Sequence, residues 1–508
     1  MEHILTAFGD ILFHPTVLLF LVFGVVVGLI VGALPGLNDT ITLAVLIPIT
    51  FAMDPKYAFM LLVGVYTSAC YGGSIPAILL KIPGTASSVV TTLDGYPMTQ
   101  RGESGKAIGI STTSSVFGGL SSSLVLMFLA PILASYALKF GPPEYFALAI
   151  LGLSTVAGMS GDNVLKSLIV CVIGLIISTV GMSPQTGYPR YTFGNDYLLE
   201  GLPFVPMLIG LFGVTSVFEV AEGLKSRVKD GTFAKMTVPR IGKVLPDLAM
   251  VKRLLPTWIT SSAIGNLIGV IPGAGMIMAI YMAYDQAIRA NKDKKFGTGV
   301  PEGIAAPEAA NNAVVASSMV PLMSLGVPGN STSALFLGAL MIQGLRPGPS
   351  LFQDAPEVAY IIIVGFFVAN LIMGPVGILI AKFLSGIIFR IPRETLTAAI
   401  ALLCVTGAFA VGNSIFNVWI MLIFGILGYV FNKLKLPHSP LILAVILGSM
   451  MERGLYQSMV LSKGSLMIFL TRPISLVMLA ASVFFAGAPL FSMARNRLKK
   501  RAKRGAIS

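Results

Sequence analysis

Two stretches of this 508-residue chain carry most of the information about its fold: Lys81-Ile-Pro-Gly-Thr-Ala-Ser-Ser88 and Gly326-Val-Pro-Gly-Asn-Ser-Thr-Ser333. Each follows an apolar run. Proline stops a helix because it lacks an N–H group, and glycine lets the chain turn sharply. The hydroxyl and amide residues that come next can cap the following helix. A membrane tolerates such a break only where it is buried in protein or faces a wet cavity.

The composition places these breaks in a membrane protein. Charged residues make up 11% of the chain and hydrophobic residues 55%, whereas an ordinary globular domain has about 25% charged residues. A soluble protein of this length could not cover its surface with so few charges. Apolar runs recur along the whole sequence, some too short to cross a bilayer and some interrupted by Pro-Gly. We therefore predict an all-α polytopic membrane protein with about ten to twelve full crossings and additional broken or re-entrant helices.

Internal repetition indicates that the chain arose by duplication. Three proline motifs occur twice in the same order, at offsets of 237, 245 and 250 residues: Pro35-Gly36 with Pro272-Gly273, Pro83-Gly84 with Pro328-Gly329, and Pro142 with Pro392. The offset increases along the chain, as expected of two copies separated by short insertions. We predict a first transmembrane repeat over residues 1–221 and a second over residues 256–490.

The positive charge predicts the orientation of these repeats. Of the net charge of +13, a net +5 lies between Glu222 and Arg253, and seven basic residues without an acid lie between Arg495 and Arg504. Lys and Arg resist translocation, so the linker over residues 222–255 and the tail over residues 491–508 should be cytoplasmic. No basic face interleaved with aromatic residues accompanies this charge, which argues against nucleic-acid binding. The basic flanks of the second repeat have no counterpart at the start of the first, and this asymmetry favours inverted repeats, an architecture of secondary transporters.

The two Pro-Gly loops form the predicted substrate site. N–H groups at a helix start, together with the helix dipole, favour an anion, and hydroxyls and an amide would add further donors to a carboxylate. The alternative is that Pro-Gly only ends the helices and the hydroxyls bond backbone carbonyls. The predicted site comprises Pro83, Gly84, Thr85, Ser87 and Ser88 in the first loop and Pro328, Gly329, Asn330, Ser331, Thr332 and Ser333 in the second.

Three further segments are candidates for cation coupling. Asp39 lies between apolar runs, where an ionised carboxylate is costly unless it is paired or coordinates a cation; with equal weight, Asn38 or Asp39 only caps the next helix. Glu308 shares one helical face with Asn311 and Asn312, at i, i+3 and i+4, so all three should point into the protein. The complete candidate set is Gly36, Asn38, Asp39, Thr40, Gly273, Gly275, Glu308, Asn311 and Asn312.

In this order, the motifs resemble the TctA family, the large membrane subunit of the tripartite tricarboxylate transporters. The resemblance covers nearly the whole chain and rests on Gly32-Ala-Leu-Pro-Gly36, Tyr71-Gly-Gly-Ser-Ile-Pro76, Lys81-Ile-Pro-Gly-Thr85, Asp94-Gly-Tyr-Pro97, Ala306-Pro-Glu-Ala-Ala-Asn-Asn312 and Gly326-Val-Pro-Gly329. It implies a multi-pass protein of the bacterial inner membrane that works with a small membrane subunit and a periplasmic substrate-binding protein. It also implies import of carboxylates, tricarboxylate or citrate-like compounds or dicarboxylates, driven by an ion gradient.

Two other classes of function stay open at this point. An integral-membrane enzyme acting on lipid-linked substrates needs a clustered acid–metal site or a motif such as His-Glu-x-x-His, and the sequence contains no such motif. A stand-alone anion transporter or channel would need rings of like charge or repeated carbonyl filters. Cys70, Cys171 and Cys404 lie far apart in apolar runs and indicate neither a disulfide framework nor a zinc site. We expect no enzyme activity, no metal and no cofactor besides the coupling ion, Na⁺ or H⁺.

Overall fold

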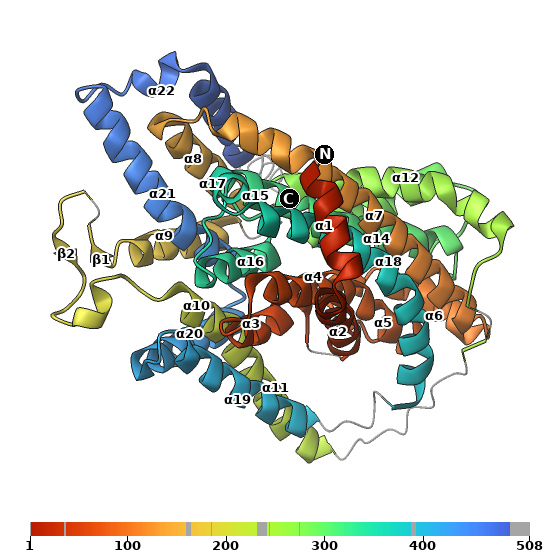
Figure 1. Cartoon of the computed structure of the whole chain (residues 1–508). Helices are drawn as coiled ribbons and strands as arrows, with labels where there is room; N and C mark the ends of the chain where they lie inside the picture. The colour runs from red at the N-terminus through yellow and green to blue at the C-terminus, as the bar shows by residue number, and fades with distance from the viewer. Residues whose placement is uncertain are drawn as a thin grey trace, which may run out of the picture. The chain divides into compact units, whose positions relative to one another are not determined.

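The computed structural model describes residues 2–34, 37–158, 164–183, 185–230, 241–242, 244–273, 275–387 and 393–487. This part of the chain is almost entirely helical (Figure 1), and its one described sheet is a two-stranded hairpin. The prediction of an all-α polytopic membrane protein is confirmed.

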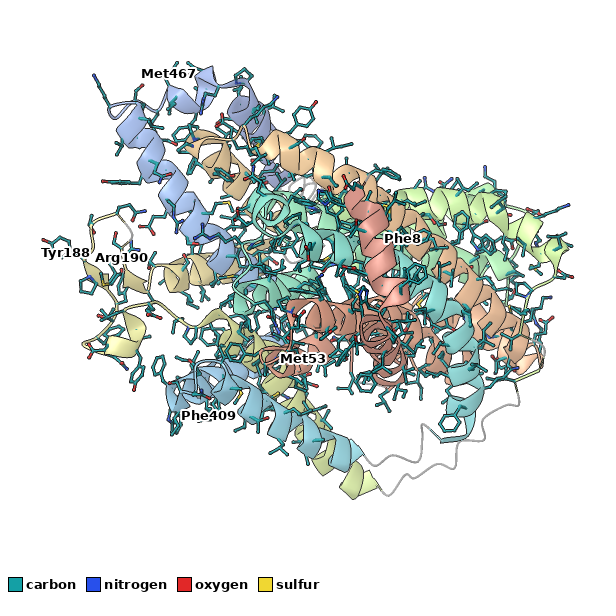
Figure 2. The ribbon with its side chains drawn as sticks, viewed as in Figure 1. Phe8, Met53, Tyr188, Arg190, Phe409 and Met467 are labelled. Carbon is teal, nitrogen blue, oxygen red and sulfur yellow. The ribbon has the colours of Figure 1, made fainter. Side chains whose placement is uncertain are left out.

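Six helices in the described residues are long and apolar enough to cross a bilayer: Pro15–Gly32, Pro55–Leu80, Ser104–Ala137, Phe204–Glu222, Pro356–Phe383 and Ile415–Lys433. Shorter apolar helices cover Asp39–Thr50, Val164–Ser178, Ser331–Ile342, Thr397–Ala410 and Pro473–Gly487. Large apolar side chains such as Phe409 and Met467 are exposed (Figure 2), as expected of surfaces that face lipid. The count of ten to twelve crossings and the inverted orientation stay predictions.

The chain divides into two compact units that do not coincide with the predicted repeats. Unit 1 comprises Met1–Ala134, Val205–Ile271 and Gly275–Tyr429, and unit 2 comprises Ser135–Phe204, Pro272–Ala274 and Val430–Ser508. Each unit therefore combines a segment of the first predicted repeat with a segment of the second.

Unit 1 contains all or most of the following helices: α1 (Glu2–Phe13), α2 (Pro15–Gly32), α3 (Asp39–Thr50), α4 (Pro55–Gly72), α5 (Ser74–Leu80), the 3₁₀ helix η1 (Ala86–Ser88), α6 (Thr91–Gln100), α7 (Ser104–Ala137), α10 (Phe204–Leu208), the π-helical turn η4 (Ile209–Val214), α11 (Thr215–Asp230), α12 (Leu248–Val270), α13 (Met276–Ala290), α14 (Pro301–Ser317), α15 (Met319–Leu325), α16 (Ser331–Ile342), α17 (Pro349–Asp354), α18 (Pro356–Ile387), α19 (Arg393–Ala410) and α20 (Ile415–Lys433). The predicted basic linker is thus partly helical, since α11 extends into it and α12 begins within it. Residues 231–240 of the linker and the basic tail lie outside the described residues.

Glycines let two helix pairs of unit 1 approach closely, in matching ways. A Cβ atom built on Gly28 of α2 would lie 2.6 Å from the carbonyl oxygen of Val65 in α4. A Cβ on Gly265 of α12 would lie equally close, at 2.6 Å, to the carbonyl oxygen of Ala310 in α14. These residues stand at the offsets of 237 and 245 that separate the repeated motifs. Small residues allow such backbone contact between membrane helices, and the pair α2–α4 is packed like the pair α12–α14.

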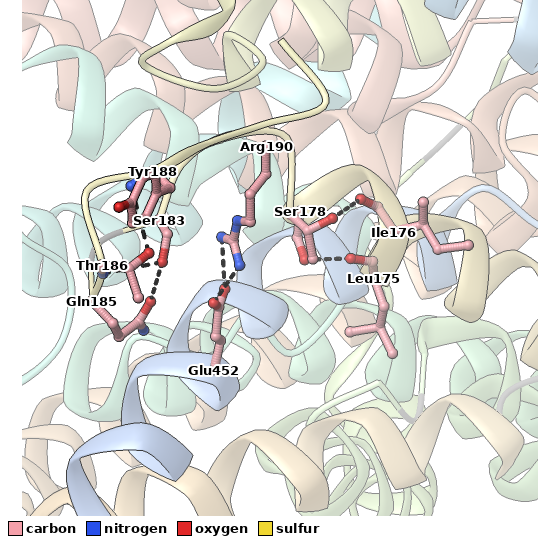
Figure 3. A network of polar contacts seen from close by, with 10 residues as sticks. Leu175, Ile176, Ser178, Ser183, Gln185, Thr186, Tyr188, Arg190 and Glu452 are labelled. Carbon is pink, nitrogen blue, oxygen red and sulfur yellow. Dashed lines mark hydrogen bonds and ion pairs between the residues drawn. The ribbon is translucent and has the colours of Figure 1, made fainter. Parts of the chain in front are cut away.

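Unit 2 is built around three helices and a hairpin. Its elements are α8 (Pro142–Gly158), α9 (Val164–Ser178), β1 (Gly181–Met182), β2 (Pro189–Arg190), the 3₁₀ helix η3 (Asp196–Leu198), α21 (Ser439–Leu461), α22 (Ile468–Thr471) and the helix Pro473–Gly487. The helix α21 lies against α8 and α9 (Figure 1). Arg190 of the hairpin forms two hydrogen bonds to Glu452 of α21, at 2.6 and 3.1 Å (Figure 3). This ion pair fixes the hairpin to α21.

Each unit contains helices from the ends of both predicted repeats. In unit 2, α8 and α9 from the first repeat pack on α21 from the second. In unit 1, α19 and α20 from the second repeat pack on η4 and α11 from the first. The hydroxyl of Thr215, at the start of α11, donates to the carbonyl oxygen of Gly425 in α20 at 3.2 Å. Each unit therefore needs helices from both predicted repeats.

Candidate functional site

The second Pro-Gly loop begins a helix of twelve residues, as the sequence predicts. Asn330 is the N-cap of α16: its Oδ1 accepts from the backbone N–H of Ser333 at 2.8 Å, and the Ser333 hydroxyl accepts from the backbone N–H of Asn330 at 2.8 Å. This reciprocal capping box satisfies two of the N–H groups that a helix start leaves unpaired. The N-terminus of α16, with its dipole, therefore has a fixed position in unit 1.

The first loop has a similar cap but a different continuation. The backbone N–H of Thr85 donates to the Ser88 hydroxyl at 3.3 Å, and the Thr85 and Ser87 hydroxyls lie 3.0 Å apart. This cap opens the three-residue 3₁₀ helix η1, and Val89 and Val90 keep right-handed helical φ and ψ values that continue the chain into α6. Both loops therefore carry a capping box, but the first starts with a short 3₁₀ helix and the second with a regular α-helix. Lys81 ends α5 in a left-handed conformation, with its ammonium group 5.9 Å from the ring of Tyr96.

Both Pro-Gly loops fold back onto the helix break before them in the same way. The N–H of Gly84 donates to the carbonyl oxygen of Gly73 at 3.0 Å, and a Cβ atom on Gly84 would also meet the carbonyl oxygen of Gly32 at 2.3 Å. A Cβ atom on Gly329 would meet the carbonyl oxygens of Ser318 and Gly269 at 2.8 and 3.0 Å. Only glycine fits this approach of backbones, which explains the residue type in both loops.

Two of the predicted sets meet at the start of α16. The Thr332 hydroxyl donates to Oδ2 of Asp39 at 2.6 Å, and the Thr40 and Thr332 hydroxyl oxygens lie 2.8 Å apart. Since the Thr332 proton points to Asp39, Thr40 donates to Thr332. Asn38 rather than Asp39 caps α3, because its Oδ1 accepts from the N–H of Ile41 at 2.7 Å. The Asp39 carboxylate, in the first turn of α3, contacts the first turn of α16 through the Thr332 side chain.

Tyr66 of α4 connects this loop to the break between α14 and α15. The amide Nδ2 of Asn330 donates to the Tyr66 hydroxyl at 2.9 Å, and that hydroxyl lies 3.1 Å from the hydroxyl of Ser318. Tyr66 is fully buried. Tyr66 was not identified from the sequence, although Tyr66, Thr67 and Ser68 form a polar group inside an otherwise apolar run.

Glu308 lies on α14 with no exposed surface. Its Oε1 accepts hydrogen bonds from Ser74, at 2.5 Å, and from Thr91, and its Oε2 accepts from Ser115 at 2.9 Å. These three hydroxyls belong to α5, α6 and α7 and were not identified from the sequence. Glu308 therefore points into the protein, as the helical spacing predicts.

Asn311 and Asn312 are buried on the same helix as Glu308. The Nδ2 atom of Asn311 donates to the carbonyl oxygen of Cys70 at 3.2 Å, and that of Asn312 donates to the carbonyl oxygen of Thr67 at 3.3 Å. Both amides thus hold α14 against α4. Gly273 and Gly275 adopt positive φ values of 77° and 79° in the turn between α12 and α13, and Gly36 lies outside the described residues.

Asp94, in the motif Asp94-Gly-Tyr-Pro97, anchors the loop before α14. Its Oδ1 accepts from the backbone N–H groups of Gly297, Gly299 and Val300 at 2.9, 2.9 and 2.8 Å. Its Oδ2 accepts from the Tyr284 hydroxyl at 2.9 Å. Asp94 thereby holds the N-terminal end of α14, the helix that carries Glu308, to α6.

Comparison with known proteins agrees with the sequence motifs. Residues 18–443 match the tripartite tricarboxylate transporter TctA family. The chain is 36% identical over 479 residues to the uncharacterized 52.8 kDa protein in the TAR-I ttuC' 3' region of Agrobacterium vitis, covering 94% of each chain. It is 34% identical over 213 residues to the uncharacterized protein in the TAR-II ttuC' 3' region of the same organism, covering 42% of this chain and 87% of that relative. No solved structure matches significantly.

Proposed function

Because this chain belongs to the tripartite tricarboxylate transporter TctA family, we propose that it is the large membrane subunit of an importer that uses an ion gradient to take up carboxylates. The substrates are tricarboxylates of the citrate type or dicarboxylates. A periplasmic binding protein delivers the substrate, and a small membrane subunit completes the complex in the bacterial inner membrane. The linker and the tail face the cytoplasm, and the two repeats are inverted.

The contact between Thr332 and Asp39 is the observation that supports ion coupling most directly. The Thr332 hydroxyl has one proton, and that proton is donated to Asp39 at 2.6 Å. The same hydroxyl and the N-terminus of α16 are the groups that we propose for a substrate carboxylate. A substrate anion and an ionised Asp39 would therefore compete for the same donors and repel each other.

A cation resolves this competition. When Na⁺ or H⁺ neutralises Asp39, the Thr332 hydroxyl is released and the helix start can accept a substrate carboxylate. Asn330, held by Tyr66, fixes the position of the loop in which this exchange takes place. Substrate then binds well only when the cation is bound, which is the thermodynamic requirement for symport.

Reconstitution tests this proposal. The chain is inserted into proteoliposomes with the small membrane subunit, and the binding protein is added outside with radiolabelled di- and tricarboxylates. We expect uptake only when the binding protein and an inward Na⁺ or H⁺ gradient are both present. Uptake that continues without a gradient and without the binding protein would point instead to a channel, and no uptake of any carboxylate would refute the proposed substrate class.

A further inference from the structure

Glu308 is a buried carboxylate without a compensating charge. No ion pair joins it to a Lys, Arg or His side chain in the described part of the chain, and its surface is fully covered. Another buried acid on the same helix, Glu302, differs in this respect because Arg253 and Lys294 contact it at 2.7 and 2.8 Å. An isolated charge in an apolar interior is costly, so it either binds a cation or takes up a proton.

The shell around Glu308 consists of oxygen atoms. Ser74, Thr91 and Ser115 each direct a hydroxyl to the carboxylate, and each hydroxyl oxygen keeps lone pairs that can bind a cation. These hydroxyls come from three different elements of the first repeat, whereas Glu308 comes from the second. The shell is complete only while α14 lies against α5, α6 and α7.

A second observation is the kind of polar atom that is left unpaired. Among the described residues of unit 1, seven buried side-chain polar atoms have no hydrogen-bond partner, and all seven are oxygens: those of Thr67, Ser111, Ser262, Asn266, Asn311, Asn312 and Asn370. Ser111 lies one helical turn from Ser115, and Asn311 lies one turn from Glu308. Four of the seven are amide oxygens, which can only accept, and two of these, on Asn311 and Asn312, lie on the helix of Glu308. Buried polar atoms are normally paired, so these two acceptors near Glu308 lack a donor or a positive charge.

We propose that Glu308, Ser74, Thr91 and Ser115 form an occluded site for one monovalent cation, Na⁺ or H⁺, distinct from the site at Asp39. A single carboxylate balances a single positive charge, and a neutral shell of hydroxyl and amide oxygens suits Na⁺ or a proton. Divalent ions usually bind several carboxylates, and the described residues contain no cluster of three acidic, His or Cys side chains. The Glu308 and Asp39 sites share none of their hydroxyl partners.

The role of this site in transport rests on the proposed function. With one cation at Asp39 and one at Glu308, each transport cycle carries two cations. Because the shell joins elements of both repeats, cation binding stabilises the arrangement seen here over any arrangement that separates α14 from α5, α6 and α7. The other titratable groups on α14 and on the helices packed around it are Glu302 of α14, Lys56, Tyr57, Tyr66, Cys70 and Tyr71 of α4, Asp94 and Tyr96 of α6, Lys106 and Tyr136 of α7, Lys252 and Arg253 of α12, and Tyr281, Tyr284, Asp285 and Arg289 of α13.

The first test compares Glu308→Gln with Glu302→Gln in proteoliposomes, by two measurements. In Glu308→Gln, the rate of substrate exchange without an ion gradient should stay within about threefold of the wild-type rate, because the neutral side chain imitates the occupied site. Accumulation driven by the gradient should fall about tenfold or more, because one coupled cation is lost. Glu302→Gln, on the same helix but outside the site, should accumulate substrate normally. Normal accumulation by Glu308→Gln would overturn the proposal.

A second test uses Ser115→Ala, with Ser122→Ala as the control on the same helix, and measures cation binding to purified protein. Loss of one hydrogen bond to a charged group corresponds to about a tenfold change in the half-saturating cation concentration. If Na⁺ is the ligand, that concentration rises, because an oxygen ligand is lost. If H⁺ is the ligand, the half-saturating concentration falls, because the ionised carboxylate loses a stabilising donor and binds a proton more tightly. An unchanged value in Ser115→Ala would refute the site.

The two proposals fail in distinguishable ways. Cation binding to purified protein does not require a carboxylate, so Ser115→Ala tests the Glu308 site even if wild type transports no carboxylate. Conversely, carboxylate uptake that depends on a gradient in wild type and is unaltered by Glu308→Gln would leave the proposed function intact and refute only the Glu308 site.

Discussion

Replacing Asp39 by Asn tests whether the cation acts through competition for Thr332. The Thr332 hydroxyl lies 2.6 Å from Oδ2 of Asp39, and a substrate carboxylate bound to the same hydroxyl at about 2.7 Å would place the two anionic oxygens about 5 Å apart. At an effective dielectric constant of about 20, two unit charges at this distance repel each other by about 3 kcal/mol. This energy corresponds to about a hundredfold weaker binding of substrate to the cation-free protein.

Asp39→Asn removes this repulsion and preserves the shape of the side chain. We expect substrate binding without cation to become about a hundredfold tighter than in wild type, and the remaining effect of added Na⁺ or acid to be only that of the Glu308 site. The assay is equilibrium binding of radiolabelled carboxylate to purified protein, with and without Na⁺ at two pH values. Asp10→Asn is the control, because Asp10 pairs with Lys56 at 3.2 Å and contacts no part of the site. If Asp39→Asn keeps the cation dependence of wild type, competition at Thr332 is not the coupling mechanism.

Three further predictions concern other parts of the chain. Thr332→Ala should reduce uptake at limiting substrate about tenfold, because a bond to a charged group is lost. Ser87→Ala should reduce uptake less than about threefold, since Ser87 bonds only within its own loop. Equal reductions in uptake assays would contradict the different roles of these two hydroxyls. Asp94→Ala leaves three backbone N–H groups and a tyrosine hydroxyl unpaired, so its melting temperature in detergent should fall by several degrees, consistent with a loss of about 2 kcal/mol or more. Cysteines at Lys235 and Lys503 should not react with an impermeant reagent outside intact cells, because both segments are predicted to be cytoplasmic; labelling from outside would reverse the topology.

Local features of the site could be predicted from the sequence because proline, glycine and capping residues act on their own neighbours. The break before Asn330 and the helix that follows it are of this kind. The first loop shows the limit of such reasoning. Its motif is equally suggestive, but the chain after it starts with a 3₁₀ helix and reaches the regular α-helix α6 only at Thr91.

Contacts between distant segments could not be predicted, because they depend on how the helices pack. Thr332 is 293 residues from Asp39, and the hydroxyl of Ser115 is 193 residues from its partner Glu308. Helical spacing correctly places Glu308 on an inward face, but it carries no information about which hydroxyls lie opposite. The same holds for Asp94, whose three backbone N–H partners have no recognisable sequence signal.

The packing of α21 on α8 and α9 has consequences for biosynthesis. The helices α8 and α9 leave the ribosome about 260 residues before α21 begins, an interval of roughly 13–50 s at bacterial rates of synthesis. During that time the faces that α21 will cover must be shielded by lipid or by the insertion machinery. Gene fission at the linker would yield two polypeptides, each of which lacks helices needed by both units.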